Sequence, residues 1–69
     1  MSAWKYTRLT GLGVSKWTRN GDWVTRSDGR PDFCHIGVAG DHIAVIEASP
    51  ASARKFVDRY KENTRKAKP

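Results

Sequence analysis

The sequence contains a single cysteine, Cys34, and no run of about 18 consecutive apolar residues. One cysteine excludes an internal disulfide, and a lone thiol is typical of a reducing compartment such as the cytoplasm. Without a long apolar run we expect no transmembrane helix. The first residues, Met1 to Arg8, also lack the apolar segment of a secretory signal. These absences predict a cytoplasmic protein with no membrane partner.

Patterns typical of catalysis or metal binding are missing as well. A structural zinc site needs four ligands at spacings such as Cys-x₂₋₄-Cys or His-x₃₋₅-His, and neither spacing occurs. Cys34 and His35 are neighbours in a strand-like segment, so their side chains point to opposite faces. A chain of this size also leaves little room for a ligand pocket of about 300 Å³ or more. We therefore expect no enzyme, no metal or other cofactor and no small-molecule substrate.

The composition is that of one small folded domain. Of the 69 residues, 38% are hydrophobic, and three Trp, two Tyr and two Phe are among them. This content argues against global disorder. Chains below about 70–80 residues often need a disulfide, a metal or a partner to supplement the core, so a homo-oligomer is one expectation. We predict a single domain over residues 1–69, with a strand-like segment at 1–12, antiparallel strands at 14–48, a helix at 49–65 and a basic tail at 66–69.

The strongest local signal is a β-hairpin around Asn20-Gly21. Asn-Gly supplies the two residues of positive φ that a type I′ turn requires, and strand-like segments flank it on both sides. Alternation along these strands places Trp17 and Trp23 on opposite faces of the hairpin. One tryptophan is therefore exposed unless another segment covers it. The candidate cover is the segment from Trp4 to Leu9.

Two further strand-like segments, 33–38 and 42–48, are joined by a short turn. With an even-numbered loop between them, one face of this pair is almost wholly apolar, and we expect it to be core. The predicted core residues of this face are Cys34, Ile36, Val38, Ile43 and Val45.

A helix is predicted to follow Ser49-Pro50, because Ser is a favoured N-cap and Pro suits the first helical position. Its apolar stripe at i, i+3, i+4 and i+7 is formed by Ala53, Phe56, Val57 and Tyr60. The expected fold is α+β, with an antiparallel sheet of three to four strands packed against one C-terminal amphipathic helix.

The last twenty residues carry most of the charge imbalance. Residues 50–69 hold seven Lys or Arg against Asp58 and Glu62, a local net charge of +5, and the other 49 residues add only +1 to the formal +6. On the predicted helix the bases form two rows beside the apolar stripe, and the two acids lie opposite it. One row contains Arg54, Lys61 and Arg65; the other contains Lys55, Arg59 and Lys66. A polyanion is the first partner to consider.

Two interpretations of these bases stay open. In the first, the bases contact phosphates. In the second, their aliphatic stems cover the edges of the core, and their charges are neutralised in i, i+4 ion pairs such as Arg54–Asp58. The hairpin poses the same choice, since basic groups interleaved with Trp suit base stacking, whereas small domains also bury their aromatics. The candidate nucleic-acid contacts are Lys16, Trp17, Arg19, Arg26, Arg30, Arg54, Lys55, Arg59, Lys61, Arg65 and Lys66.

The hairpin and the turn after it read Gly13-Val-Ser-Lys-Trp-Thr-Arg-Asn-Gly-Asp-Trp-Val-Thr-Arg-Ser-Asp-Gly-Arg30. This stretch resembles the sheet of AP2-like, arm-type DNA-binding domains of phage and transposon integrases, and residues 49–56 are similar to the start of their helix. Such domains place a three-stranded sheet against DNA and back it with a C-terminal helix. The resemblance implies DNA contacts from Lys16, Thr18, Arg19, Thr25, Arg26 and Arg30.

The likeness covers about half of the chain, and residues 31–48 are too long for the single third strand of that pattern. Residues 49–57 are also similar to the helix of a family of short actinobacterial proteins of unknown function, often encoded beside regulators.

The expected function is that of a small basic nucleic-acid-binding protein, with DNA as the favoured ligand and a regulatory role, such as transcription regulation, or an accessory one. Its phosphate contacts would come from the C-terminal helix and tail and from the basic Trp hairpin. The alternative is a non-catalytic protein-interaction module, such as a small phage-type or regulator-associated protein that docks on an acidic partner surface. Exposed Trp and Arg would then act as interface hot spots.

Overall fold

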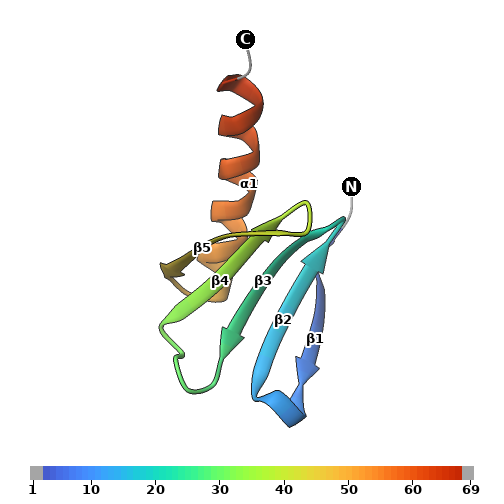
Figure 1. Cartoon of the computed structure of the whole chain (residues 1–69), viewed down its shortest axis with the longest axis vertical. Helices are drawn as coiled ribbons and strands as arrows, with labels where there is room; N and C mark the ends of the chain where they lie inside the picture. The colour runs from blue at the N-terminus through green and yellow to red at the C-terminus, as the bar shows by residue number, and fades with distance from the viewer. Residues whose placement is uncertain (1–2, 68–69) are drawn as a thin grey trace.

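The computed structural model describes residues 3–67, and it describes side chains up to residue 64. Five strands form one antiparallel sheet in the order β1-β2-β3-β4-β5, so each strand pairs with its neighbours in sequence, and one helix follows (Figure 1). The elements are β1 Lys5–Leu9, a 3₁₀ turn Thr10–Leu12, β2 Val14–Arg19, β3 Asp22–Ser27, β4 Phe33–Val38, β5 Asp41–Glu47 and α1 Pro50–Ala67. The α+β class is confirmed, and the sheet has five strands rather than three to four.

The hairpin at Asn20-Gly21 is confirmed. These residues have φ of 50° and 90°, as a type I′ turn requires, and the resulting register pairs Trp17 with Val24. Trp17 and Trp23 therefore lie on opposite faces of the sheet. A second turn of the same kind joins β4 to β5, and the Gly40 N–H donates to the Gly21 carbonyl over 2.8 Å. This bond holds the two turns together at one end of the sheet.

The N-terminal segment does not cover Trp23, the tryptophan on the face opposite α1, which is partly buried. It forms β1 instead, which pairs edge to edge with β2 and places Tyr6 opposite Trp17. The backbone N–H and C=O groups of β2 would otherwise lack partners on that side, and pairing with β1 satisfies them. One face of the sheet is covered by α1, which we call the covered face. The other carries no further element of the described chain, and we call it the open face.

The hydrophobic core lies between the covered face and α1. Its fully buried residues come from β3, β4 and the helix, and they are Val24, Cys34, Ile36, Ala53 and Val57. Around them pack partly buried side chains, among which are Trp4, Trp17, Val38, Ile43, Ala44 and Ile46. α1 rests mainly on β3 and β4, and its C-terminal part runs past the end of the sheet (Figure 1).

A β-bulge in β5 corrects the predicted core face. Ile36 pairs with Ala44 while Gly37 pairs with His42, so Ile43 is an extra residue without a partner. Beyond the bulge, the faces of β5 are exchanged relative to a regular strand. Val45, predicted to be core, therefore lies on the open face and is 49% exposed.

The helix is also rotated from its predicted orientation. Ala53 and Val57 are buried as expected, but Phe56 is 41% exposed. Arg54 and Lys61 are partly buried instead, as is Tyr60, so the side of α1 that meets the sheet includes polar residues in place of Phe56. The helix begins at Pro50 as predicted, and the Ser49 hydroxyl accepts the Ser52 N–H over 3.2 Å. It runs to Ala67, two residues beyond its predicted end, and residues 68–69 of the predicted tail lie outside the described part of the chain.

Candidate nucleic-acid interface

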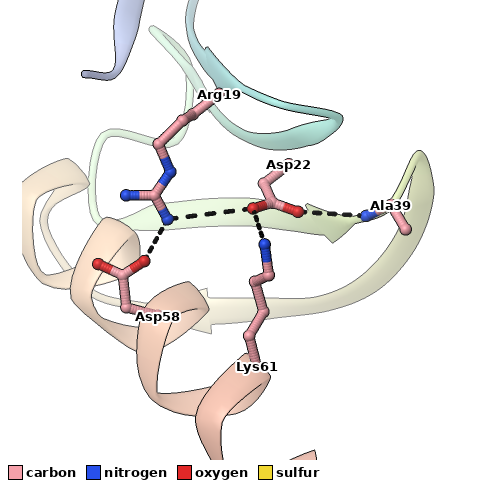
Figure 2. A network of polar contacts seen from close by, with 5 residues as sticks. All are labelled: Arg19, Asp22, Ala39, Asp58 and Lys61. Atoms are coloured by element: carbon pink, nitrogen blue, oxygen red, sulfur yellow. Dashed lines mark hydrogen bonds and ion pairs between the residues drawn. The ribbon is translucent and has the colours of Figure 1, made fainter. Parts of the chain in front are cut away.

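Asp22 organises the contact between the helix and the end of the sheet (Figure 2). This carboxylate is only 1% exposed, because it lies between the hairpin turn and α1. It accepts a hydrogen bond from Lys61 Nζ at 2.7 Å and one from the Ala39 backbone N–H at 3.3 Å. A guanidinium nitrogen of Arg19 lies 4.0 Å away and bonds to Asp58 of the helix. A buried carboxylate is thus paired with cations from two elements.

Two more predicted contact residues belong to the same interface. The Arg54 guanidinium lies over the Trp17 ring, 5.4 Å from its centroid, and Arg19 lies over the Trp4 ring at 4.4 Å. Trp17, Arg19, Arg54 and Lys61 therefore hold the helix on the sheet. Asp58 faces the sheet through Arg19, which corrects its predicted position opposite the apolar stripe.

Arg8 is a further cation with an internal partner. Its guanidinium makes two hydrogen bonds to the Asp28 carboxylate, which tie β1 to the loop after β3. These bonds from Arg8 hold the pKa of Asp28 below its usual range. Charge already matched in this way contributes less to the attraction of a distant polyanion.

The remaining predicted residues are spread over three regions. Arg26 lies on the covered face beside the start of the helix, where Asp32 and Glu47 also line a hollow of about 420 Å³. Lys55 and Arg59 are exposed on the outer side of α1. The side chains of Arg65 and Lys66 lie outside the described part of the chain.

Lys16 and Arg30 lie at the open face, each beside a hollow. One hollow, of about 690 Å³, is lined by Ser27, Gly29, Arg30, Phe33, His35 and Val45. The other, of about 420 Å³, is lined by Val14, Lys16, Trp23, Thr25, Ser27 and His35. The two adjoin each other at Ser27 and His35. The sequence-based expectation of little room for such a volume is therefore wrong, because shallow hollows form on a face that no element of the described residues covers.

Three aromatic rings lie close together on the open face, and two of them, Trp23 and His35, line these hollows. Trp23 lies opposite Gly37, and a Cβ added to Gly37 would come within 2.0 Å of the indole ring, so the ring lies against the bare backbone of β4. The His42 ring lies 5.8 Å from the Trp23 ring between centroids, and the His35 ring lies 5.4 Å from the His42 ring. His35 Nδ1 and His42 Nε2 are 3.2 Å apart, within hydrogen-bonding distance. We call Trp23, His42 and His35 the aromatic tract.

Sequence reasoning did not include these three residues among the contacts. The alternation of the hairpin does place Trp23 away from Trp17. The positions of His42 and His35, however, depend on the pairing of β4 with both neighbours and on the bulge.

Cys34 lies in the core, where burial raises the pKa of its thiol. Its Sγ donates to the Ala48 carbonyl over 3.3 Å. Among residues 3–67 no group of three or more His, Cys, Asp or Glu is placed to hold a metal ion. No helix in this part of the chain is long and apolar enough to cross a membrane.

Comparison of the chain with protein-family models, with curated proteins and with solved structures finds no match.

Proposed function

We propose that this chain is a small nucleic-acid-binding protein of the regulatory or accessory kind, with DNA as the favoured ligand. The observation that carries the proposal is that Lys16 and Arg30 line two hollows of the open face, which adjoin each other at His35 of the aromatic tract. Neither side chain forms an ion pair within the described part of the chain, whereas Arg8, Arg19 and Lys61 do. The positive charge available to an external anion therefore includes this face.

The whole-molecule charge supports the same function. A formal net charge of +6 on 69 residues attracts polyanions, and the exposed bases Lys55 and Arg59 add to the field from the helix. Each phosphate that a cation neutralises releases counterions, so the logarithm of the affinity falls with the logarithm of the salt concentration by about 0.9 per contact on duplex DNA.

The test is charge reversal of two matched pairs. Lys16→Glu with Arg30→Glu changes the open face, and Lys55→Glu with Arg59→Glu changes the outer side of the helix. Both double variants carry the same formal charge of +2, down from +6. Binding of labelled single-stranded and duplex oligonucleotides is measured by fluorescence anisotropy over a salt series.

We expect the open-face variant to lose about tenfold or more in affinity and to show a salt slope smaller by about 2, since two phosphate contacts are removed. The helix variant loses less, because only the general field is weakened. Equal losses would assign the binding to net charge alone, and a larger loss in the helix variant would place the interface on α1. No binding by the unmodified protein at low salt would overturn the proposed function.

One observation favours the alternative, a protein-interaction module that docks on an acidic surface. Phe56 is 41% exposed and lines a hollow of about 250 Å³ with Ser52, Lys55 and Arg59 on the outer side of α1. An aromatic ring between two cations is the composition of an interface hot spot. Absence of oligonucleotide binding would favour this function, and in that case Phe56→Ala is the variant that should weaken the protein complex.

A further inference from the structure

The ring of Trp23 presents one of its two faces outward. One face lies against the backbone of Gly37, which has no side chain to lift the ring away from the sheet. Trp23 is partly buried by this contact, and the remaining ring surface belongs to the hollow that Lys16 also lines. A ring that lies flat on a sheet offers a π face, which is the surface on which a nucleic-acid base stacks.

Two further rings extend this surface across the sheet. The His42 ring on β5 lies 5.8 Å from the Trp23 ring, and the His35 ring on β4 lies 5.4 Å from the His42 ring. Lys16 lines one hollow together with Trp23 and His35, and Arg30 lines the adjoining hollow together with His35. A group of rings with cations in the adjoining hollows matches a strand whose bases stack while its phosphates are neutralised.

The width of the sheet argues against insertion into duplex DNA. Five strands at about 4.8 Å spacing span roughly 19 Å between the outermost strands, whereas the major groove is about 12 Å wide. The aromatic tract spreads over three strands, β3, β4 and the edge strand β5, rather than lying on one edge strand. In a duplex the base faces are also occupied by their stacked neighbours, so a π face on the protein has nothing to stack against.

We infer that the aromatic tract of Trp23, His42 and His35 is a binding site for the unpaired bases of a single-stranded nucleic acid. Lys16 and Arg30, in the adjoining hollows, contact phosphates of the same strand. This inference rests on the proposed function and deepens it, because it states that the ligand is single-stranded and names the residues that bind its bases.

The experiment compares oligo(dT) of about 10 nucleotides, a length within the usual range for one small binding domain, with a duplex of the same length. Five proteins are titrated at low salt: the unmodified chain, Trp23→Phe, Trp23→Thr, His42→Ala and Phe56→Ala. Phe56→Ala is the control, since it removes an exposed aromatic ring from the outer side of α1. Intrinsic tryptophan fluorescence is recorded during each titration, and thermal unfolding of each variant is measured separately.

We expect the unmodified chain to bind oligo(dT) more tightly than the duplex, with quenching of tryptophan fluorescence. Trp23→Thr should weaken oligo(dT) binding by about tenfold or more, because alanine-type truncations of stacking residues have effects of that size. Trp23→Phe keeps a ring and should stay within about threefold of the unmodified protein. His42→Ala should weaken binding by a few fold, and Phe56→Ala should leave it unchanged.

Failure of this inference is distinguishable from failure of the proposed function. Duplex binding equal to or tighter than oligo(dT) binding, or oligo(dT) binding insensitive to Trp23→Thr and His42→Ala, overturns the stacking site and leaves nucleic-acid binding intact. If Trp23→Thr does not fold, the stacking site is tested by the quenching of tryptophan fluorescence in the unmodified chain and by the affinity of His42→Ala. No quenching and an unchanged affinity would overturn it. No binding of either oligonucleotide overturns both proposals.

Discussion

Gly37 determines how Trp23 lies on the sheet. A Cβ at this position would approach Cε2 of the indole ring to 2.0 Å, far inside van der Waals contact. A glycine in a strand interior usually weakens the strand, and an aromatic ring on the neighbouring strand compensates by covering the exposed backbone. Gly37 therefore leaves the space that the Trp23 ring occupies, and the ring covers the backbone that Gly37 leaves exposed.

We expect Gly37→Ala to lower the free energy of unfolding by about 1–3 kcal/mol, the usual effect of overpacking, because the ring must move. Gly11→Ala is the matched control, since nothing lies within 4 Å of a Cβ there. In a Trp23→Thr background the Gly37→Ala change should cost much less, because the clash is gone. Urea unfolding of the parent, Gly37→Ala, Trp23→Thr and the double variant measures this coupling, with Gly11→Ala measured alongside. A Gly37→Ala protein as stable as the parent would show that the ring does not lie on Gly37.

Sequence reasoning reached part of this residue-scale picture. Asn20-Gly21 fixes the register between β2 and β3 within a two-residue loop, so the opposite orientations of Trp17 and Trp23 follow directly. The pairing of Trp23 with Gly37 depends instead on the longer loop of residues 28–32. A loop of that length sets no single register, so no local pattern indicates that Gly37 lies under the ring.

At the scale of elements, charged contacts rather than the apolar stripe alone set the rotation of α1. Lys61 Nζ reaches the buried Asp22 carboxylate at 2.7 Å, and Arg54 lies over Trp17. Turning Phe56 toward the sheet would move Lys61 away and leave Asp22 without its closest cation. A buried carboxylate that loses its partner is costly, and this cost outweighs the gain from burying one more ring.

Lys61→Met should therefore destabilise the protein, by about 1–2 kcal/mol, because Asp22 loses a hydrogen bond and a charge. The expected loss of stability is modest because the Lys61 side chain is 37% exposed and Arg19 remains near Asp22. Lys55→Met, on the exposed side of the same helix, is the control and should change stability by less than about 0.5 kcal/mol. Equal stability of the two variants in chemical denaturation would contradict the role given to Lys61.

The positions of the strands and the helix could largely be predicted from the sequence. Which side of β5 and of α1 is buried could be predicted less well. The Asn-Gly turn, the Ser49-Pro50 helix start and the α+β class follow from local chemistry that acts over a few residues. The bulge at Ile43 was not predictable, because it depends on pairing between β4 and β5. The sequence likewise indicated two basic rows on the helix but not which row meets the sheet. Only the packing of α1 shows that Arg54 and Lys61 contact the sheet while Lys55 and Arg59 are exposed.

At the scale of the whole molecule, the topology predicts simple folding. Each strand pairs only with its neighbours in sequence, so most pairing is local, and the helix docks on β3 and β4. We expect two-state refolding with a single exponential phase in about milliseconds. Stopped-flow tryptophan fluorescence checks this, and curvature or a missing amplitude at low denaturant would point to an intermediate that the topology does not require.

Because α1 stabilises the sheet from one side only, most open-face side chains carry little of the core and are free to change. Lys16, Thr25, His35 and Val45 can be replaced without opening a cavity, provided that Trp23 stays over Gly37. The positions that stabilise the fold thus lie mainly on the covered face, and the positions available for ligand contacts lie on the open face. Such a scaffold suits directed evolution, with a library of substitutions across one face and an untouched helix behind it.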